Sequence, residues 1–273
     1  MQRDMRKSEF LSGPWWISRV SYFGGLSPRP NPKSGGARKR SVSRLLEPLT
    51  RPRGESPGVH YVRPGVGILG ADFGREELRH VGAAAGSLIL IFTAGFVGGI
   101  ARPGFLLNFV FVLPYMLVAA PGPFLLALWV QKRVGARSGC TIEFRVQSQW
   151  LFLSLFFAGV LGWIFAIPGT LLRFGNLTRS AAGKMGLAGP ATLIAVAFGA
   201  RIAAEAVGPG AGWVAFAFVL VGWVNSLLAI FQSIPLPGFP GYDVWRWSKL
   251  SFAIMIAFAV AAFLFTRTSS ALF

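Results

Sequence analysis

The chain has 273 residues, of which 53% are hydrophobic, and its 27 Lys and Arg against 10 Asp and Glu give a formal net charge of +17. Long apolar runs with few charges indicate a polytopic helical membrane protein and exclude a soluble α/β enzyme; the period-two alternation of a membrane barrel is missing. One cysteine excludes an intrachain disulfide. The only histidines, His60 and His80, precede the first apolar run, which argues against a histidine-based metal centre.

Residues 1–59 are predicted to form a basic tail rich in Pro, Gly and Arg, with twelve Lys and Arg against four Asp and Glu. Its densest basic cluster consists of Arg38, Lys39, Arg40 and Arg44. Such a segment beside a membrane gains about 1 kcal/mol per cation from anionic headgroups. Composition alone is typical of a solvated, disordered tail, whereas Trp15 and Trp16 favour a segment that contacts a partner.

Residues 60–79 are expected to form a connector and a short helix. The Val, Ile and Gly content of residues 61–70 favours an extended piece. Asp72 is predicted to cap the helix, because Glu76 and Glu77 then fall in the first turn, where the helix dipole favours anions.

Residues 80–273 are expected to form a membrane bundle of about five or six segments. The apolar runs predict spans at about 80–101, 106–131, 183–207, 213–234 and 250–265. The second span contains Pro114, Pro121 and Pro123, which a membrane helix tolerates only where neighbours satisfy the freed carbonyls. Arg201 and Glu205 are one turn apart and are expected to pair.

The apolar run at 150–168 is long enough to cross, but the charges favour a re-entrant or interfacial segment. Re-entry puts the basic loops on one side with the tail, leaving Arg102 and Arg267 on the other. A crossing, the alternative, would divide the basic loops between the two faces. The positive-inside rule therefore predicts re-entry, a cytoplasmic amino terminus and an external carboxyl terminus.

Three stretches occur in order along the bundle: FLLALWVQKRVGARSGCTIEFR at 124–145, GKMGLAGPAT at 183–192 and NSLLAIFQSIPLPGFPGYDVWRW at 225–247. Together they resemble landmarks of the site-2 protease family of intramembrane zinc metalloproteases, most closely its archaeal members. Small residues in the second stretch, including Gly186 and Gly189, suit close approach between helices.

The resemblance implies a site whose chemistry has been removed. The family's H-E-x-x-H motif holds zinc with two His on one helical face and uses Glu as general base. Here the His, Glu and His positions are Ala127, Leu128 and Gln131, and the family's third ligand, an Asp, corresponds to Pro240. We therefore expect no catalytic residue, cofactor or metal.

Nearby polar residues are expected to be structural. Gln131 is predicted to bond a neighbouring helix, Lys132 to lie at headgroup level, and Asp243 to be a loop carboxylate. Ser226, Ser233 and Cys140 have no identifiable base that would make one of them a nucleophile.

These observations predict a noncatalytic plasma-membrane pseudoprotease that binds partner transmembrane helices as an accessory or scaffold subunit of a hetero-oligomeric complex. Anionic lipid headgroups are expected as further partners. The alternative is a membrane anchor whose basic tail docks a ribosome, RNA or an acidic protein surface. Deletion of residues 1–59 separates the two, because only the second function depends on the tail's arginines.

Overall fold

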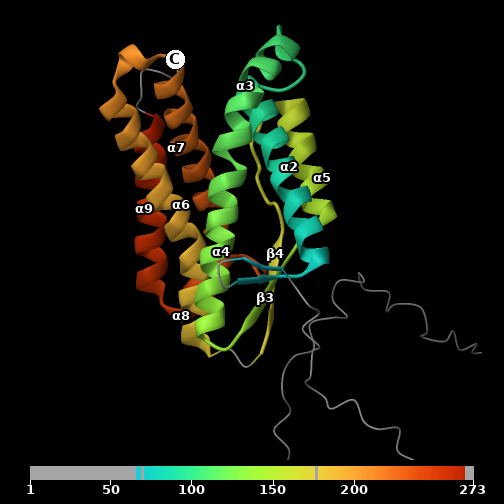
Figure 1. Cartoon of the computed structure of the whole chain (residues 1–273), viewed down its shortest axis with the longest axis vertical. Helices are drawn as coiled ribbons and strands as arrows, with labels where there is room; N and C mark the ends of the chain where they lie inside the picture. Colours follow the sequence, from blue (N-terminus) through green and yellow to red (C-terminus); the bar gives the residue numbers. More distant parts are fainter. Residues whose placement is uncertain (1–65, 69–70, 176–177, 268–273) are drawn as a thin grey trace, which may run out of the picture. The chain divides into compact units, whose positions relative to one another are not determined.

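The computed structural model describes residues 66–68, 71–175 and 178–267. The predicted tail at 1–59, with its cluster Arg38, Lys39, Arg40 and Arg44, lies outside the described residues. Within them the chain is predominantly helical, and five helices are long and apolar enough to cross a membrane. This confirms the prediction of a polytopic α-helical membrane protein (Figure 1).

The described elements are β1 (Val66–Ile68), β2 (Ala71–Phe73), α2 (Arg75–Val97), α3 (Phe105–Ala119), α4 (Pro121–Arg137), β3 (Thr141–Arg145), α5 (Ser148–Phe156), the π-helical turn η3 (Phe157–Leu161), β4 (Thr170–Phe174), α6 (Arg179–Val207), the short turn η4 (Pro209–Ala211), α7 (Trp213–Gln232), α8 (Pro240–Trp247) and α9 (Lys249–Arg267). Helices α3 and α4 together form one apolar span, and α2, α6, α7 and α9 are the others. Strands β1 and β2 pair antiparallel, as do β3 and β4, and neither pair was predicted.

The N-cap of helix α2 is Gly74 and not the predicted residue Asp72. Asp72 instead lies in β2, paired with Gly67 of β1. The Gly74 amide, which is left free at the helix start, donates to the Glu77 carboxylate at 3.4 Å. The carboxylate that accepts from the cap amide therefore belongs to the first turn of the helix itself. The hairpin of β1 and β2 directly precedes the helix.

The junction of α3 and α4 is held by a side chain from α7. Pro123 has no amide hydrogen, so it leaves the carbonyl of Ala119 without its helical donor. Asn225 Nδ2 donates to that oxygen at 3.0 Å. This confirms the expectation that a neighbouring helix satisfies a carbonyl freed by proline. The span then continues to Arg137, beyond the predicted end at residue 131.

The segment between β3 and β4 enters the bundle and returns. Strands β3 and β4 pair antiparallel from Thr141 with Phe174 to Arg145 with Thr170, so the segment begins and ends at the same place. Its tip lies at the opposite end of α2, where the Ile100 amide donates to Gly159 O at 2.7 Å. Figure 1 shows α5 running beside α2 and the chain returning in extended form. The segment at 150–168 therefore returns to the end of the bundle at which it starts, as predicted for re-entry, and does not cross to the other end.

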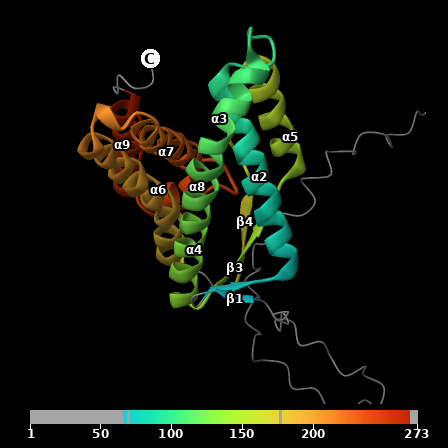
Figure 2. The ribbon, with the colours of Figure 1, turned by 45° about the horizontal axis from the view of Figure 1, so that its top comes forward.

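Two ends of the bundle can thus be defined. The sheet end carries β1 to β4, α8 and the starts of α2, α6 and α9; the loop end carries residues 98–104 and 208–212 and the end of α9 (Figures 1 and 2). The basic loops expected on one side do share the sheet end. At the loop end, Arg201 pairs with Glu205 at 2.8 Å, as expected. That the sheet end is cytoplasmic stays a prediction.

Helix α6 is in close contact with its neighbours along a stripe of glycines. A Cβ atom added at Gly183 would overlap the Trp247 side chain, one at Gly186 would approach the Pro240 carbonyl, and one at Gly189 would overlap the Gln131 amide. The prediction that Gly186 and Gly189 allow close approach is confirmed. The stripe brings α4, α6 and α8 together around the site described next.

Candidate functional site

The positions that the resemblance assigns to the protease motif lie around one small pocket at the sheet end of α4. Leu128, Gln131 and Pro240 line this pocket, and Ala127 is fully buried beside it. The remaining lining is largely aromatic and aliphatic, including Phe124, Phe144, Leu171, Phe231 and Phe239. The cavity volume is about 30 Å³. Small-molecule sites have volumes of roughly 300–1,000 Å³, so side chains fill most of the space that a substrate would need here.

Two polar side chains, those of Gln131 and Gln232, line this otherwise apolar pocket. Gln131 Nε2 and Gln232 Oε1 are both buried and have no hydrogen-bond partner among the described residues. Both side chains lie against Gly189 of α6. The prediction that Gln131 bonds a neighbouring helix is therefore wrong as far as its Nε2 is concerned, because this atom donates to no described residue. Glycine at position 189 makes room for the two amides, since a Cβ there would overlap Gln131 and crowd Gln232.

The side chains present do not fit a catalytic zinc ion. A catalytic zinc site generally takes three ligands from His, Glu, Asp and Cys and keeps one position open for water. Ala127 and Pro240 offer no side-chain donor, and Gln131 offers a neutral amide. Within residues 66–68, 71–175 and 178–267, no group of three His, Cys, Asp or Glu side chains converges. Leu128, at the position that the resemblance assigns to the general base, cannot accept a proton.

Lys132 is buried in the bundle, and the prediction that it lies at headgroup level is wrong. Its ammonium donates to the Glu77 carboxylate at 2.7 Å and to the Asp72 carbonyl at 2.5 Å, and it lies 4.2 Å from the centre of the Phe73 ring. Glu77 is 2% exposed and also accepts from the Phe144 amide at 2.8 Å. Burial of an ammonium is tolerated because a carboxylate neutralises it.

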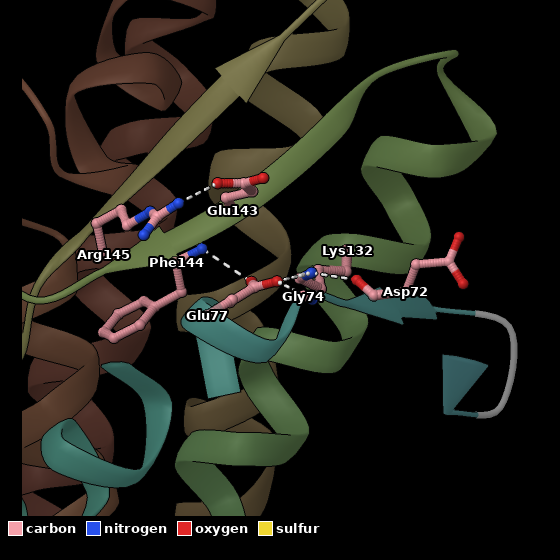
Figure 3. A network of polar contacts seen from close by, with 7 residues as sticks. All are labelled: Asp72, Gly74, Glu77, Lys132, Glu143, Phe144 and Arg145. Atoms are coloured by element: carbon pink, nitrogen blue, oxygen red, sulfur yellow. Dashed lines mark hydrogen bonds and ion pairs between the residues drawn. The ribbon is translucent and has the colours of Figure 1, made fainter. Parts of the chain in front are cut away.

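This Lys132–Glu77 pair joins three parts of the chain, as Figure 3 shows. Lys132 belongs to α4, Glu77 to the first turn of α2, and Phe144 to β3. The pair therefore fixes the start of the re-entrant segment against the helix that carries Ala127, Leu128 and Gln131. Glu143 and Arg145, on the outer face of β3, form a separate, half-exposed pair at 2.7 Å.

Asp243 was predicted to be a loop carboxylate, and this prediction is wrong. Asp243 is a buried residue of α8. Both terminal nitrogens of Arg173, on β4, donate to its carboxylate, one of them at 2.6 Å. Burial raises the pKa of Asp243, and the Arg173 guanidinium opposes that rise. The pair attaches the end of the re-entrant segment to α8, as Glu77 attaches its beginning to α2 and α4.

Sequence reasoning missed both ion pairs because their members are far apart in the chain. Lys132 is 55 residues from Glu77, and Arg173 is 70 residues from Asp243. One signal was available for the first pair. Glu77 directly precedes a long apolar run, and a carboxylate that enters a membrane helix needs a cation nearby.

The fold defines a polytopic helical membrane protein in which a re-entrant segment lies beside the pocket lined by Leu128, Gln131 and Pro240. Comparison with curated proteins finds 32% identity over 143 residues with "Putative zinc metalloprotease MJ0611" of Methanocaldococcus jannaschii, covering 51% of this chain and 73% of that protein. The chain belongs to the family of that protein. No family model matches the chain, and no solved structure matches it.

Proposed function

We propose that the protein is a noncatalytic member of the site-2 protease family that binds membrane segments of a partner, as an accessory or scaffold subunit. One observation carries the proposal. In a chain related to a protein described as a zinc metalloprotease, the ligand and base positions are Ala127, Leu128, Gln131 and Pro240, packed in a pocket of about 30 Å³.

The pocket supports the noncatalytic part of the proposal in two independent ways. Hydrolysis of a peptide bond needs an activated water and a base to take its proton. Leu128 supplies no base, and the donor set supplies no zinc site. In addition, a cavity of this size has no space for an extended peptide beside the four aromatic rings of Phe124, Phe144, Phe231 and Phe239.

The partner-binding part is supported by what the frame retains. Buried ion pairs hold both ends of the re-entrant segment: Lys132–Glu77 at its start and Arg173–Asp243 at its end. In a noncatalytic protein this segment has no substrate to position, so its retention favours another role. Helix α3 presents a broad apolar face, with Leu106, Leu107, Val110 and Val118 between 66% and 77% exposed. In a bilayer such a face contacts either acyl chains or another helix. A chain with no reaction of its own acts through such contacts.

Site-specific photo-crosslinking tests the partner-binding part. A photoreactive residue at Val110 or Val118 on α3 is expected to give one discrete protein adduct in native membranes. The same residue at Leu264, which is 56% exposed on α9, is the matched control for contact with bulk lipid. Adducts of the same kind from all three positions, without a discrete protein, would contradict the proposed α3 interface.

The basic tail favours a second candidate, an anchor that docks a ribosome, RNA or an acidic protein surface. Its support is the excess of twelve Lys and Arg over four Asp and Glu in residues 1–59. Deletion of these residues should leave the α3 adduct intact if the first proposal holds and abolish the complex if the second holds. In both proposals the protein is in the plasma membrane with the sheet end cytoplasmic, as the basic loops favour.

A further inference from the structure

A second, much larger cavity lies at the loop end, far from the degenerate protease positions. Its volume is about 890 Å³, and it lies between α2, α3, α7, α9 and the tip of the re-entrant segment. Its walls are mainly apolar and rich in aromatic rings, with Phe96, Phe111, Phe216, Trp223 and Phe263 among the lining residues. A space of this size falls within the range of small-molecule sites, which the pocket around Gln131 does not.

Charged groups of one sign border this cavity. Arg102, after α2, and Arg267, in the last turn of α9, both line it, together with the amide of Asn108. No carboxylate is among the described residues that line the cavity, and Glu205, also at the loop end, is paired with Arg201 at 2.8 Å. No ion pair of Arg102 or Arg267 occurs within the described part of the chain. The rim is therefore cationic, whereas the interior is apolar.

The rim lies at the level where headgroups are expected. Trp163, which lines the cavity, is 68% exposed, and Trp213, at the start of α7, is 71% exposed. Exposed tryptophans at the end of a membrane helix are typical of the boundary between headgroups and acyl chains. Trp223 and Leu227 lie about three and four turns further along α7 than Trp213, so the cavity reaches into the acyl region.

We propose that this cavity is a binding site for one anionic phospholipid, with the phosphate held by Arg102 and Arg267 and an acyl chain among the aromatic rings. Guanidinium groups bind phosphate oxygens through strong, charge-assisted hydrogen bonds. A partner helix fits less well. A spanning helix of about 10 Å diameter and 30 Å length occupies roughly 2,400 Å³, and its ends need no pair of cations. This site is separate from the proposed partner surface on α3.

Lipid titration of the purified full-length protein tests the proposal. The protein is washed extensively in detergent and then titrated with phosphatidylglycerol or phosphatidylcholine, and bound lipid is counted by native mass spectrometry. We expect one phosphatidylglycerol to bind in preference to phosphatidylcholine. Each of Arg102→Gln and Arg267→Gln is expected to lower the affinity about tenfold, the usual loss of one hydrogen bond to a charged group.

Two further variants locate the lipid. Arg137→Gln removes an exposed arginine at the sheet end and should leave the affinity unchanged. Leu227→Trp fills the deep part of the cavity and should lower the affinity although both rim arginines remain. Thermal unfolding of each variant checks that it is folded. Equal binding of the two lipids, or equal losses for Arg102→Gln and Arg137→Gln, would overturn the proposal. Neither result depends on whether the protein binds a partner.

Discussion

The buried Lys132–Glu77 pair yields the sharpest prediction about stability. Glu77→Gln removes the charge but keeps the shape, and it leaves the Lys132 ammonium buried beside neutral groups, including the Asp72 carbonyl and the Phe73 ring, with no carboxylate to neutralise it. Removal of one partner from a buried ion pair costs about 3–5 kcal/mol, since the remaining charge is uncompensated. For a folded unit of this size, about 2–4 °C of melting temperature corresponds to each kcal/mol. We expect the melting temperature to fall by about 6–20 °C.

The neighbouring residue Glu76 provides the matched control. Glu76 pairs with Arg79 at 3.1 Å, but the two side chains are 52% and 79% exposed. An exposed pair contributes about 0–1 kcal/mol, so Glu76→Gln should change the melting temperature by a few degrees at most. The assay is thermal unfolding in a mild detergent. The double variant Glu77→Gln/Lys132→Met should be less destabilised than the sum of its single variants. Equal effects of Glu77→Gln and Glu76→Gln would refute the buried pair.

Three further outcomes follow from other contacts. Cys140 is buried, and burial raises the pKa of its thiol, so a maleimide should label it slowly in the folded protein and rapidly after denaturation; rapid labelling of the native protein would place it at the surface. Gly183→Ala should lower the melting temperature, whereas Gly199→Ala, at an open helical position, should not; equal effects would argue against the close contact of α6. Arg173→Leu removes the cation that opposes the raised pKa of Asp243, so the variant should lose stability as the pH rises from about 4 to 7; a pH-independent loss, measured by unfolding in buffers across this range, would contradict the pairing.

The membrane spans could be predicted because they depend on local composition. Four of the five predicted spans each correspond to one long helix, and the span at 106–131 corresponds to the pair α3 and α4. The charge asymmetry was sufficient to predict that residues 150–168 return to the end at which they start. The prediction for the proline-containing second span was also confirmed. Pro123 cannot donate to the Ala119 carbonyl, and Asn225 of a neighbouring helix donates to it instead. Helix ends were less accurate, because Asp72 and Gly74 are both acceptable caps until the preceding hairpin is known.

The polar contacts of the site could not be predicted, because they depend on pairing between distant segments. Strands β3 and β4 are five residues each and are 24 residues apart, so neither is apparent until its partner is known. The same is true of Lys132 and Asp243. Each is a common surface residue by composition, and only the packing of α4 and α8 against the re-entrant segment buries it.

The central claim, that this family member has lost its metal chemistry, is tested most directly by zinc stoichiometry. The protein is purified, equilibrated with excess zinc, passed through a desalting column and analysed for metal by mass spectrometry. The account predicts zinc far below one ion per chain, since Ala127, Gln131 and Pro240 provide no ligand set. One zinc ion per chain that is lost in Gln131→Ala or Asp243→Ala would show a rebuilt site and contradict the account.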